Sequence, residues 1–324
     1  MKAIVYYGDG SQNVLKLVET EKPAPAEDEV LIKVHAASVN PLDYHLLRHA
    51  FLRRVISTIG KTKIARPGRD VAGVVESAGR NVTQFKAGDE VFGLCNGSFA
   101  DYVCARESGV TLKPHNISFE QAAAAPVVGL TALQGLRDKA NVQTGQKVLI
   151  NGAAGGVGTF AVQIAKSFGA KVSGVCSTRN VDMVQSLGAD TVIDYTRQDY
   201  TTSGEQYDVI FDLVANHSIT EHRRALTAKG IYLGLGMIGI SSAMGMMVRL
   251  VPQLVLSPFI SQKFISFTAK ADQKDLSTLG AMIESGKITP VIDRCYKLSA
   301  AGEAVSYLEG KHARGKVIID MNPA

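Results

Sequence analysis

Residues 147 to 172 read KVLINGAAGGVGTFAVQIAKSFGAKV, and this stretch decides the fold. Its first apolar run, Val148 to Ile150, is typical of a strand that is buried on both faces of a parallel sheet. From Val157 to Phe168, apolar residues recur at intervals of three and four, which predicts a helix with one buried stripe that Gly169 ends. Strand composition then resumes at Val172. The stretch therefore predicts a βαβ unit.

Four glycines, at positions 152, 155, 156 and 158, fill the turn between the expected strand and helix. A backbone without side chains permits a tight turn, lets a phosphate approach, and lets the helix pack close to the strand. The N–H groups at the helix start would then face the anion. Any tight turn before a helix favours glycine, but the two flanking strands favour nucleotide binding over a purely structural turn.

The end of the second expected strand indicates which nucleotide binds. Proteins that select NAD usually place Asp or Glu about 20 residues after the glycines, where it accepts from the ribose 2′-hydroxyl. Here residues 176 to 180 read CSTRN, and the first carboxylate is Asp182. Ser177 and Thr178 can donate to a phosphate, and Arg179 can pair with it through its planar guanidinium group. NADP(H) is therefore predicted over NAD(H); the alternative is an arginine that is merely solvated at a helix start.

The composition is that of an ordinary globular protein, with 46% hydrophobic and 20% charged residues. A chain of 324 residues favours two domains. The formal net charge is +5, and no aromatic-basic module is present, so no nucleic-acid partner is expected. The four cysteines have no paired short spacing, which argues against a disulfide framework and fits a reducing compartment. Without a recognisable export or transit signal, we expect a cytoplasmic protein.

The longest apolar neighbourhood lies at residues 246 to 260. Arg249, Pro252 and Pro258 interrupt it, and it is shorter than the ~20 residues that a membrane span needs. A membrane span is therefore not expected, whereas peripheral membrane contact stays open. We expect a monomer or a homodimer.

The chain divides by pattern into three segments. Residues 1–122 contain short β runs with turn signals, which predict a β-rich barrel domain. Residues 123–265 alternate strand and helix patterns, which predicts a doubly wound parallel sheet of the Rossmann type. Residues 266–324 add a strand, a helix near 299–309 and a final strand, and we expect them to return to the first domain. The predicted class is thus α/β, with a substrate domain and a nucleotide-binding domain.

Several stretches spread over nearly the whole chain carry a family resemblance. They are NPLDY at 40–44, PGRDVAGVV at 67–75, VGLTA at 128–132, LGADTVIDY at 187–195 and HARGKVIID near the end. With the glycine turn, they resemble the medium-chain dehydrogenase/reductase superfamily, whose first domain is GroES-like. The chain is similar to its zinc-free quinone oxidoreductase branch, near the reticulon-4-interacting-protein and chloroplast-envelope quinone oxidoreductase homologues.

The chain departs from the zinc alcohol dehydrogenases of this superfamily in two stretches. Where those enzymes carry a ligand cysteine, this chain has Asn40, and where they have Gly-His-Glu it has Gly68, Arg69 and Asp70. Neither Asn nor Arg is a usual zinc ligand. We therefore expect no metal, and we expect the histidines at positions 115, 217 and 222 to be exposed rather than liganded.

The resemblance implies a reaction that needs no metal: hydride addition from NADPH to a quinone or to an α,β-unsaturated carbonyl. Asn40 is a candidate to hold the substrate carbonyl or the nicotinamide ribose, and Asp43 to fix its loop or to contact a ribose. Tyr44 is a candidate proton donor, although known quinone oxidoreductases place a tyrosine one position later, where this chain has His45. Tyr44 can equally pack the loop, with solvent supplying the proton.

The resemblance also implies the cofactor contacts. Thr131 belongs to the nicotinamide side, and Val214, Leu235 and Gly236 end later strands at the carboxyl edge of the sheet. Lys316 either reaches the nucleotide or is a surface charge. The remaining expected contacts are Ala154, Gly155, Gly156 and Val157 for the pyrophosphate, and Ser177, Arg179 and Tyr195 for the adenosine phosphate.

Two further segments stand out. Residues 48–69, which precede Asp70, contain seven Lys and Arg residues and no acidic residue. This basic segment is a solvated face, a rim of the substrate cleft, or a contact with anionic lipid. The Met-rich segment 237–260 is either a core or dimer interface or a lid over an apolar substrate. The functional alternative to an enzyme is a nucleotide-binding regulatory or scaffolding protein with little turnover.

Overall fold

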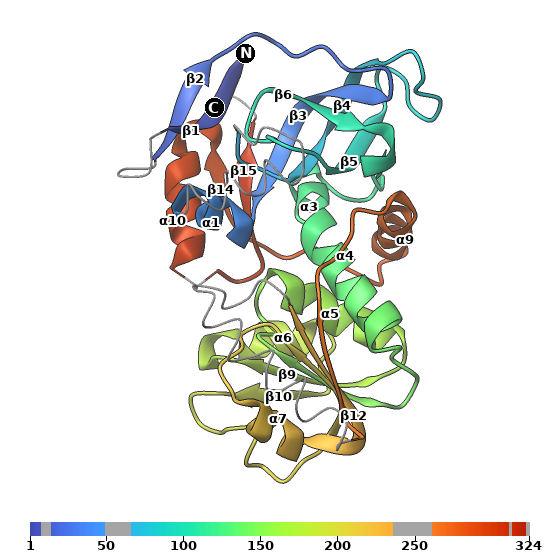
Figure 1. The fold of residues 1–324 in the computed structure, drawn as a ribbon, viewed down its shortest axis with the longest axis vertical. Coiled ribbons are helices and arrows are strands. Elements are labelled where there is room, and N and C mark those ends of the chain that lie inside the picture. The colour runs from blue at the N-terminus through green and yellow to red at the C-terminus, as the bar shows by residue number, and fades with distance from the viewer. Residues whose placement is uncertain (8–13, 49–65, 236–260, 311–312, 322–324) are drawn as a thin grey trace. The chain divides into compact units, whose positions relative to one another are not determined.

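The computed structural model describes residues 1–7, 14–48, 66–235, 261–310 and 313–321. The segments 49–65 and 237–260, which hold most of the basic segment and all of the Met-rich segment, lie outside these ranges, as does Gly236. The chain forms two compact units (Figure 1). Unit 1 comprises Met1–Leu130 and Ala271–Ala324, and unit 2 comprises Thr131–Lys270, so the first boundary falls within helix α4 (Pro126–Gln134).

Unit 1 is built on a seven-stranded sheet in the order β14-β15-β3-β4-β5-β7, with β6 pairing with β3. β1 and β2 form a separate antiparallel pair. The long β3 strand is central because it pairs with β4, β6 and β15, all antiparallel. The strands are β1 (Lys2–Tyr7), β2 (Val14–Glu19), β3 (Glu29–Val39), β4 (Asp70–Ala78), β5 (Glu90–Leu94), β6 (Tyr102–Arg106), β7 (Val110–Leu112), β14 (Ile292–Lys297) and β15 (Lys316–Asp320).

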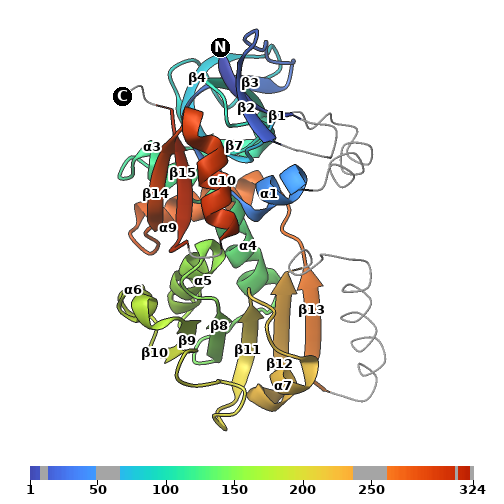
Figure 2. The ribbon, with the colours of Figure 1, turned by 90° about the vertical axis from the view of Figure 1, so that its left-hand side faces the viewer.

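The carboxyl-terminal segment completes the sheet of unit 1. β15 pairs with β3 in the register Ile318↔Ser38, so the last strand lies beside a strand near the start of the chain. Helix α10 packs against β15 and beside α1, and its apolar face enters a core that includes Ile4, Val39 and Val317 (Figure 2). The helices of this unit are α1 (Pro41–Arg48), α3 (Phe119–Ala123), α9 (Gln273–Glu284) and α10 (Ala301–Glu309).

Unit 2 is a six-stranded parallel sheet in the order β10-β9-β8-β11-β12-β13. The chain winds outward from β8 through β9 to β10 and then continues from β11 on the other side, so the strand order reverses between β8 and β11 (Figure 2). Ligands of such sheets bind outside the carboxyl ends of the strands at this reversal. The strands are β8 (Lys147–Asn151), β9 (Lys171–Cys176), β10 (Thr191–Asp194), β11 (Tyr207–Asp212), β12 (Leu226–Leu235) and β13 (Lys263–Phe267).

Helices connect these strands as the alternating pattern predicts. α5 (Gly156–Ser167) packs against β8 and β9, α6 (Val181–Ser186) against β9 and β10, and α7 (Ile219–Ala225) against β12. The expected α/β class, with a parallel sheet in unit 2, is confirmed. None of the helices in the described ranges is both long and apolar enough to cross a membrane.

The glycine turn after β8 is tight. Gly152 has φ of 88°, a left-handed conformation that favours glycine. A Cβ atom at Gly158 would lie 2.1 Å from the carbonyl oxygen of Gly152, so only glycine lets α5 approach the turn this closely. The helix starts and ends within one residue of the predicted range, with Gly169 following at φ of 80°.

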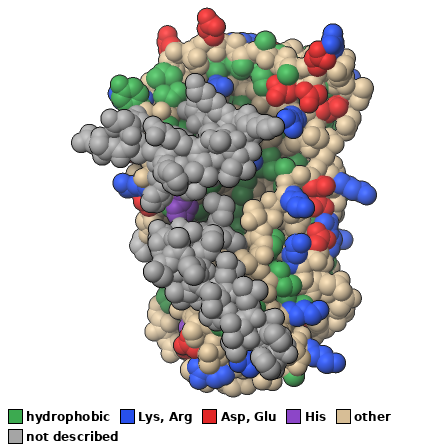
Figure 3. All heavy atoms as spheres, viewed as in Figure 1, with side chains coloured by type: hydrophobic (Ala, Val, Ile, Leu, Met, Phe, Trp, Pro, Cys, Tyr) green, Lys and Arg blue, Asp and Glu red, His purple; other side chains and the backbone are tan. Residues whose placement is uncertain are grey.

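Charged side chains of both signs are mixed among the described residues of one face of the protein. On the face drawn in Figure 3, Lys and Arg side chains lie among Asp and Glu side chains of the described residues. Two arginines of the basic segment have polar partners: Arg48 pairs with Glu309 and Arg69 donates to Asn96. These two contacts are those of a solvated protein surface.

Candidate active site

Three neighbouring strands of unit 1 bring the residues around Asn40 together. Asn40 follows the end of β3, Asp70 begins β4, and Lys316 begins β15. The pairing registers Ser38↔Asp70 and Val39↔Val317 align these three positions side by side. All three side chains are nearly completely buried. The sheet pairing therefore assembles a charged cluster from segments that are far apart in the sequence.

Hydrogen bonds lock this cluster. Lys316 Nζ donates to Asn40 Oδ1 at 2.7 Å and to the carbonyl of Val39 at 3.1 Å, and lies 3.4 Å from Asp70 Oδ2. Asn40 Nδ2 donates to Asp70 Oδ2 at 2.9 Å, and Ser38 Oγ donates to the same oxygen. Both ends of the Asn40 amide thus have partners within unit 1. Burial lowers the pKa of Lys316, and the neighbouring Asp70 and Asp43 oppose that effect.

The expectation that Lys316 could be a surface charge is wrong, because Lys316 is only 3% exposed. The physical reason is that β15 lies between β14 and β3, inside the sheet rather than at its edge. The sequence could not show this, because the strand pairing is long-range.

Asp43 lies in the first turn of α1 and fixes the loop before it. Its carboxylate accepts from the backbone N–H of Asn40 at 2.8 Å and from that of Gly68 at 2.9 Å. Burial raises the pKa of Asp43 to about 6, although the two backbone hydrogen bonds act in the opposite direction. Asp43 was expected either to fix its loop or to contact a ribose. The hydrogen bonds to Asn40 and Gly68 support the first of these roles.

Tyr44 packs among apolar residues. It is partly buried against the core that includes Val39 and Val305, and its ring lies 4.4 Å from that of His45. Burial, and then the nearby Glu309, raise the pKa of Tyr44. A phenol with a raised pKa holds its proton more firmly, so these contacts favour the packing role over proton donation.

The predicted pyrophosphate contacts lie at the start of α5. Gly155 is the N-cap residue, and Gly155, Gly156 and Val157 are partly exposed, whereas Ala154 is buried. A Cβ atom at Gly155 would meet only the carbonyl oxygen of Gly152, at an ordinary 3.5 Å. The first N–H groups of a helix have no intrahelical acceptors, so this open turn can bind an anion.

An open pocket of about 560 Å³ lies at the ends of β9 and β10. Thr178 lines it, but the Thr178 hydroxyl donates to Asp194 Oδ2 at 2.6 Å and is therefore already engaged. Arg197 also lines the pocket, although it was not among the expected contacts. The sequence signal that could have identified it is a basic residue shortly after the end of β10. Ser177, Arg179 and Tyr195 flank this region but are not among the lining residues, which are Thr178, Val181, Asp182, Val192, Asp194, Arg197 and Gln198.

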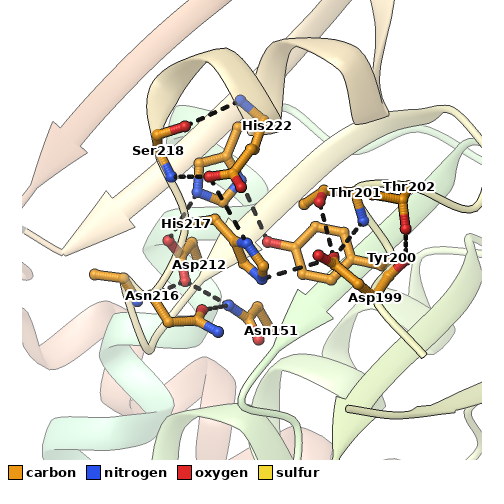
Figure 4. Close-up of polar contacts among 12 residues, drawn as sticks. Asn151, Asp199, Tyr200, Thr201, Thr202, Asp212, Asn216, His217, Ser218 and His222 are labelled. Atoms are coloured by element: carbon orange, nitrogen blue, oxygen red, sulfur yellow. Dashed lines mark hydrogen bonds and ion pairs between the residues drawn. The ribbon is translucent and has the colours of Figure 1, made fainter. Parts of the chain in front are cut away.

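The reversal of strand order carries a polar pair that the sequence analysis did not single out. Asn151 ends β8 and Asp212 ends β11, and Asn151 Nδ2 donates to Asp212 Oδ1 at 2.9 Å (Figure 4). Each is a polar residue that directly follows a buried apolar run, a signal that could have been read from the sequence.

Beyond Asp212, Val214 is 48% exposed at the carboxyl edge. Of the other expected contacts in unit 2, Thr131 is buried in α4 and Leu235 is partly exposed at the end of β12.

His222 is not exposed, and that expectation is wrong. It is 1% exposed because α7 places its ring 4.5 Å from the ring of Tyr232 and its Nε2 atom 3.3 Å from Asp212 Oδ2. His115 is exposed as expected, and His217 is partly buried. Within the ranges that the structure describes, no group of three or more His, Cys, Asp and Glu residues is arranged to hold a metal ion.

Comparison with known proteins shows the family of the chain. The family model described as the alcohol dehydrogenase GroES-like domain matches residues 26–115, and the model described as zinc-binding dehydrogenase matches residues 187–319. The chain is 36% identical to 2-methylene-furan-3-one reductase of Solanum lycopersicum, over 100% of this chain and 80% of the relative. It is 35% identical to the chloroplastic NADPH-dependent alkenal/one oxidoreductase of Arabidopsis thaliana, over 98% and 79% respectively.

A solved structure extends the likeness to the whole fold. The quinone oxidoreductase from Coxiella burnetii has a TM-score of 0.85 and 31% sequence identity to this chain, with 99% of each chain covered. The resemblance that the sequence motifs carried is confirmed. The chain belongs to the medium-chain dehydrogenase/reductase superfamily, in the branch of the quinone oxidoreductases.

Proposed function

We propose that the protein is an NADPH-dependent oxidoreductase that reduces quinones or α,β-unsaturated carbonyls by hydride transfer. The observation that carries the proposal is the open glycine turn at the start of α5, which lies at the reversal of strand order in unit 2. The relatives named alkenal/one oxidoreductase and quinone oxidoreductase support this reading along nearly the whole chain.

The residues of unit 2 fit NADP(H) as the cofactor. The N–H groups of Gly156 and Val157 would hold the pyrophosphate beside Gly155, whose own N–H donates to the Gly152 carbonyl. Arg179 and Arg197 supply positive charge near the strand ends where the 2′-phosphate would bind. When bound, the nicotinamide supplies the hydride. The protein contributes binding and orientation. We assign the cofactor to a domain of residues 123–265 and the substrate to residues 1–122 and 266–324.

We propose further that the reaction is independent of zinc. The Lys316 ammonium group lies against Asn40 Oδ1, at the position of the family's ligand cysteine, and against Oδ2 of Asp70, which follows Arg69 in place of the family's His-Glu pair. A fixed positive charge in this cluster disfavours a second cation, and an amide is not a usual zinc ligand. The same contacts orient Asn40, so its amide is pre-set toward Lys316 and Asp70 rather than free to turn.

The proton that completes the reduction comes from solvent in this proposal, because Tyr44 packs against the core of unit 1 and Asp43 is used to hold backbone N–H groups. A reducing compartment such as the cytoplasm fits four cysteines that are all free thiols. The Arabidopsis relative is chloroplastic, so cell fractionation is the test of location.

Turnover separates an enzyme from a nucleotide-binding regulatory or scaffolding protein. The experiment measures NADPH oxidation with a panel of quinones and enones, with and without a chelator. We expect turnover with at least one acceptor, unchanged by chelation. NADPH binding without turnover on any acceptor would favour the regulatory alternative, and loss of turnover on chelation would contradict zinc independence.

A further inference from the structure

We propose that Asp212 is a positioning residue that holds the glycine turn after β8 and the loop after β11 together, and thereby controls binding of the nicotinamide half of NADP(H). The inference rests on the proposed function. If the pyrophosphate lies on the glycine turn and the adenosine end lies toward β9, the other half of the dinucleotide extends toward β11, where this loop begins.

One oxygen of Asp212 binds both segments. Oδ1 accepts from Asn151 Nδ2 at 2.9 Å, at the residue just before the glycine turn. The same oxygen accepts from the backbone N–H of Val214 at 3.1 Å and of Ala215 at 2.9 Å. Asn151 Nδ2 also donates to Asn216 Oδ1 at 2.9 Å (Figure 4). A single buried carboxylate thus connects the end of β8 to two consecutive residues of the following loop, and the Asn151 side chain adds a contact to the next residue, Asn216.

The other oxygen of Asp212, Oδ2, contacts side chains of β12 and α7. Oδ2 accepts from Tyr232 Oη at 2.8 Å and lies 3.3 Å from His222 Nε2. His222 Nε2 has no hydrogen-bond partner among the described residues, so this is a close polar contact beside Oδ2. His222 Nδ1 lies 3.3 Å from Tyr200 Oη. Because β12, α7 and the segment around Tyr200 hold one side of the carboxylate, the other side is aimed at the loop.

Asp212 stays charged in this setting. Burial alone would raise its pKa, but the contacts from His222, Ala215 and Tyr232 outweigh burial and hold the pKa of Asp212 well below its usual range. The charge makes each hydrogen bond to the loop stronger than one to a neutral acceptor.

The loop needs this support because its backbone is strained. Ala215 has φ of 62°, a left-handed conformation that a residue with a Cβ atom adopts at a cost. Its N–H is one of those that Asp212 accepts. The preceding Val214 is exposed and lies against the glycine turn, since a Cβ atom on Gly152 would come within 2.8 Å of Val214 Cγ2. Relaxation of the loop would therefore change the surface beside the glycine turn.

The experiment compares Asp212→Asn with the native protein by calorimetric titration of two ligands. NADPH reaches both halves of the proposed site, whereas adenosine 2′,5′-bisphosphate reaches only the adenosine half. We expect Asp212→Asn to weaken NADPH binding by about tenfold, as for the loss of one charge-assisted hydrogen bond. Binding of adenosine 2′,5′-bisphosphate should stay within about twofold, a difference that general destabilisation would not produce.

The matched control is Asp208→Asn. Asp208 lies on the same strand β11 near its opposite end and also accepts from the neighbouring segment, through the backbone N–H of Lys147 at 2.9 Å. This variant should bind both ligands like the native protein. Ala215→Gly in the Asp212→Asn background should recover part of the NADPH affinity, because glycine adopts positive φ without a Cβ penalty.

Equal NADPH affinity in Asp212→Asn and the native protein would overturn the inference, as would a parallel loss of both ligands. A native protein that binds neither ligand would overturn the proposed function itself. If Asp212→Asn does not fold, the same titrations are made on His222→Phe. This variant removes the polar atom beside Asp212 Oδ2 and keeps a ring against Tyr232. Unchanged NADPH affinity in His222→Phe would contradict the inference.

Discussion

Asn40 and Lys316 are 276 residues apart in the sequence, and their buried side chains are joined by a 2.7 Å hydrogen bond. The bond exists because β15 pairs with β3, whose last residue directly precedes Asn40. It places a positive charge beside Asp70 in the interior of unit 1. The candidate catalytic loop is therefore tied to the last strand of the chain.

Lys316→Met should destabilise the protein strongly, because it leaves the Asp70 carboxylate buried without its cation. Removal of one partner of a buried pair costs about 3–5 kcal/mol in the free energy of unfolding. Lys316→Met combined with Asp70→Asn should be more stable than Lys316→Met alone. The control is Lys297→Met, which breaks a partly exposed pair with Asp320 and should cost less than about 1 kcal/mol. Denaturant unfolding measures all four proteins, and equal costs at positions 316 and 297 would contradict the prediction.

Asp43 should make the stability of the protein depend on pH between about 4 and 6. Its pKa is about 6 in the folded protein against an ordinary value of 3.8, so the folded state binds the proton more tightly than the unfolded state. Stability contributed by this group is therefore greatest at low pH and falls as the pH rises toward 6, by an amount on the order of 3 kcal/mol. Asp43→Asn should remove this component. Unfolding free energies measured at several pH values test it, and parallel pH profiles for the two proteins would show that Asp43 titrates normally.

Two glycines of the turn should respond differently to substitution. Gly155→Val should abolish the rise in melting temperature that NADPH produces and should shift the melting temperature of the free protein by less than about 3 °C, because a Cβ atom there meets only an ordinary contact. Gly158→Ala should instead destabilise the free protein by about 1–3 kcal/mol, since its Cβ atom would lie 2.1 Å from the Gly152 carbonyl oxygen. A Gly155→Val protein with the native thermal shift would mean that the turn does not bind the cofactor.

Arg179 and Arg197 should together determine the preference for NADPH. Charge-assisted hydrogen bonds contribute about 1.5–3 kcal/mol, and the lower value applies to these exposed positions, so each Arg→Ala substitution should weaken NADPH binding by about tenfold and leave NADH binding nearly unchanged. Arg197 also lies 3.5 Å from Asp194, which is a second reason to expect the lower value. Affinities for both nucleotides are measured by fluorescence titration. Equal affinities of the native protein for NADPH and NADH would contradict the prediction.

Local sequence patterns were sufficient to predict the secondary structure and the parallel sheet of unit 2. The helix after the glycine turn was predicted over 157–168 and is observed over Gly156–Ser167, because its apolar spacing and terminal glycine are properties of neighbouring residues. The alternation of strands and helices likewise predicted the parallel sheet. Arg197 and the Asn151–Asp212 pair were missed, although polar residues at strand ends were visible, because their importance depends on which strands are adjacent.

The sequence by itself determined the family, the βαβ unit and the glycine turn, since glycine spacing and hydrophobic period act over a few residues. Tertiary structure alone decided the environment of the titratable groups. Lys316 is buried because two strands flank β15, and His222 is buried because α7 turns it toward Tyr232 and Asp212. Burial and charge pairing depend on contacts between distant segments, and those contacts form only when the sheets are assembled.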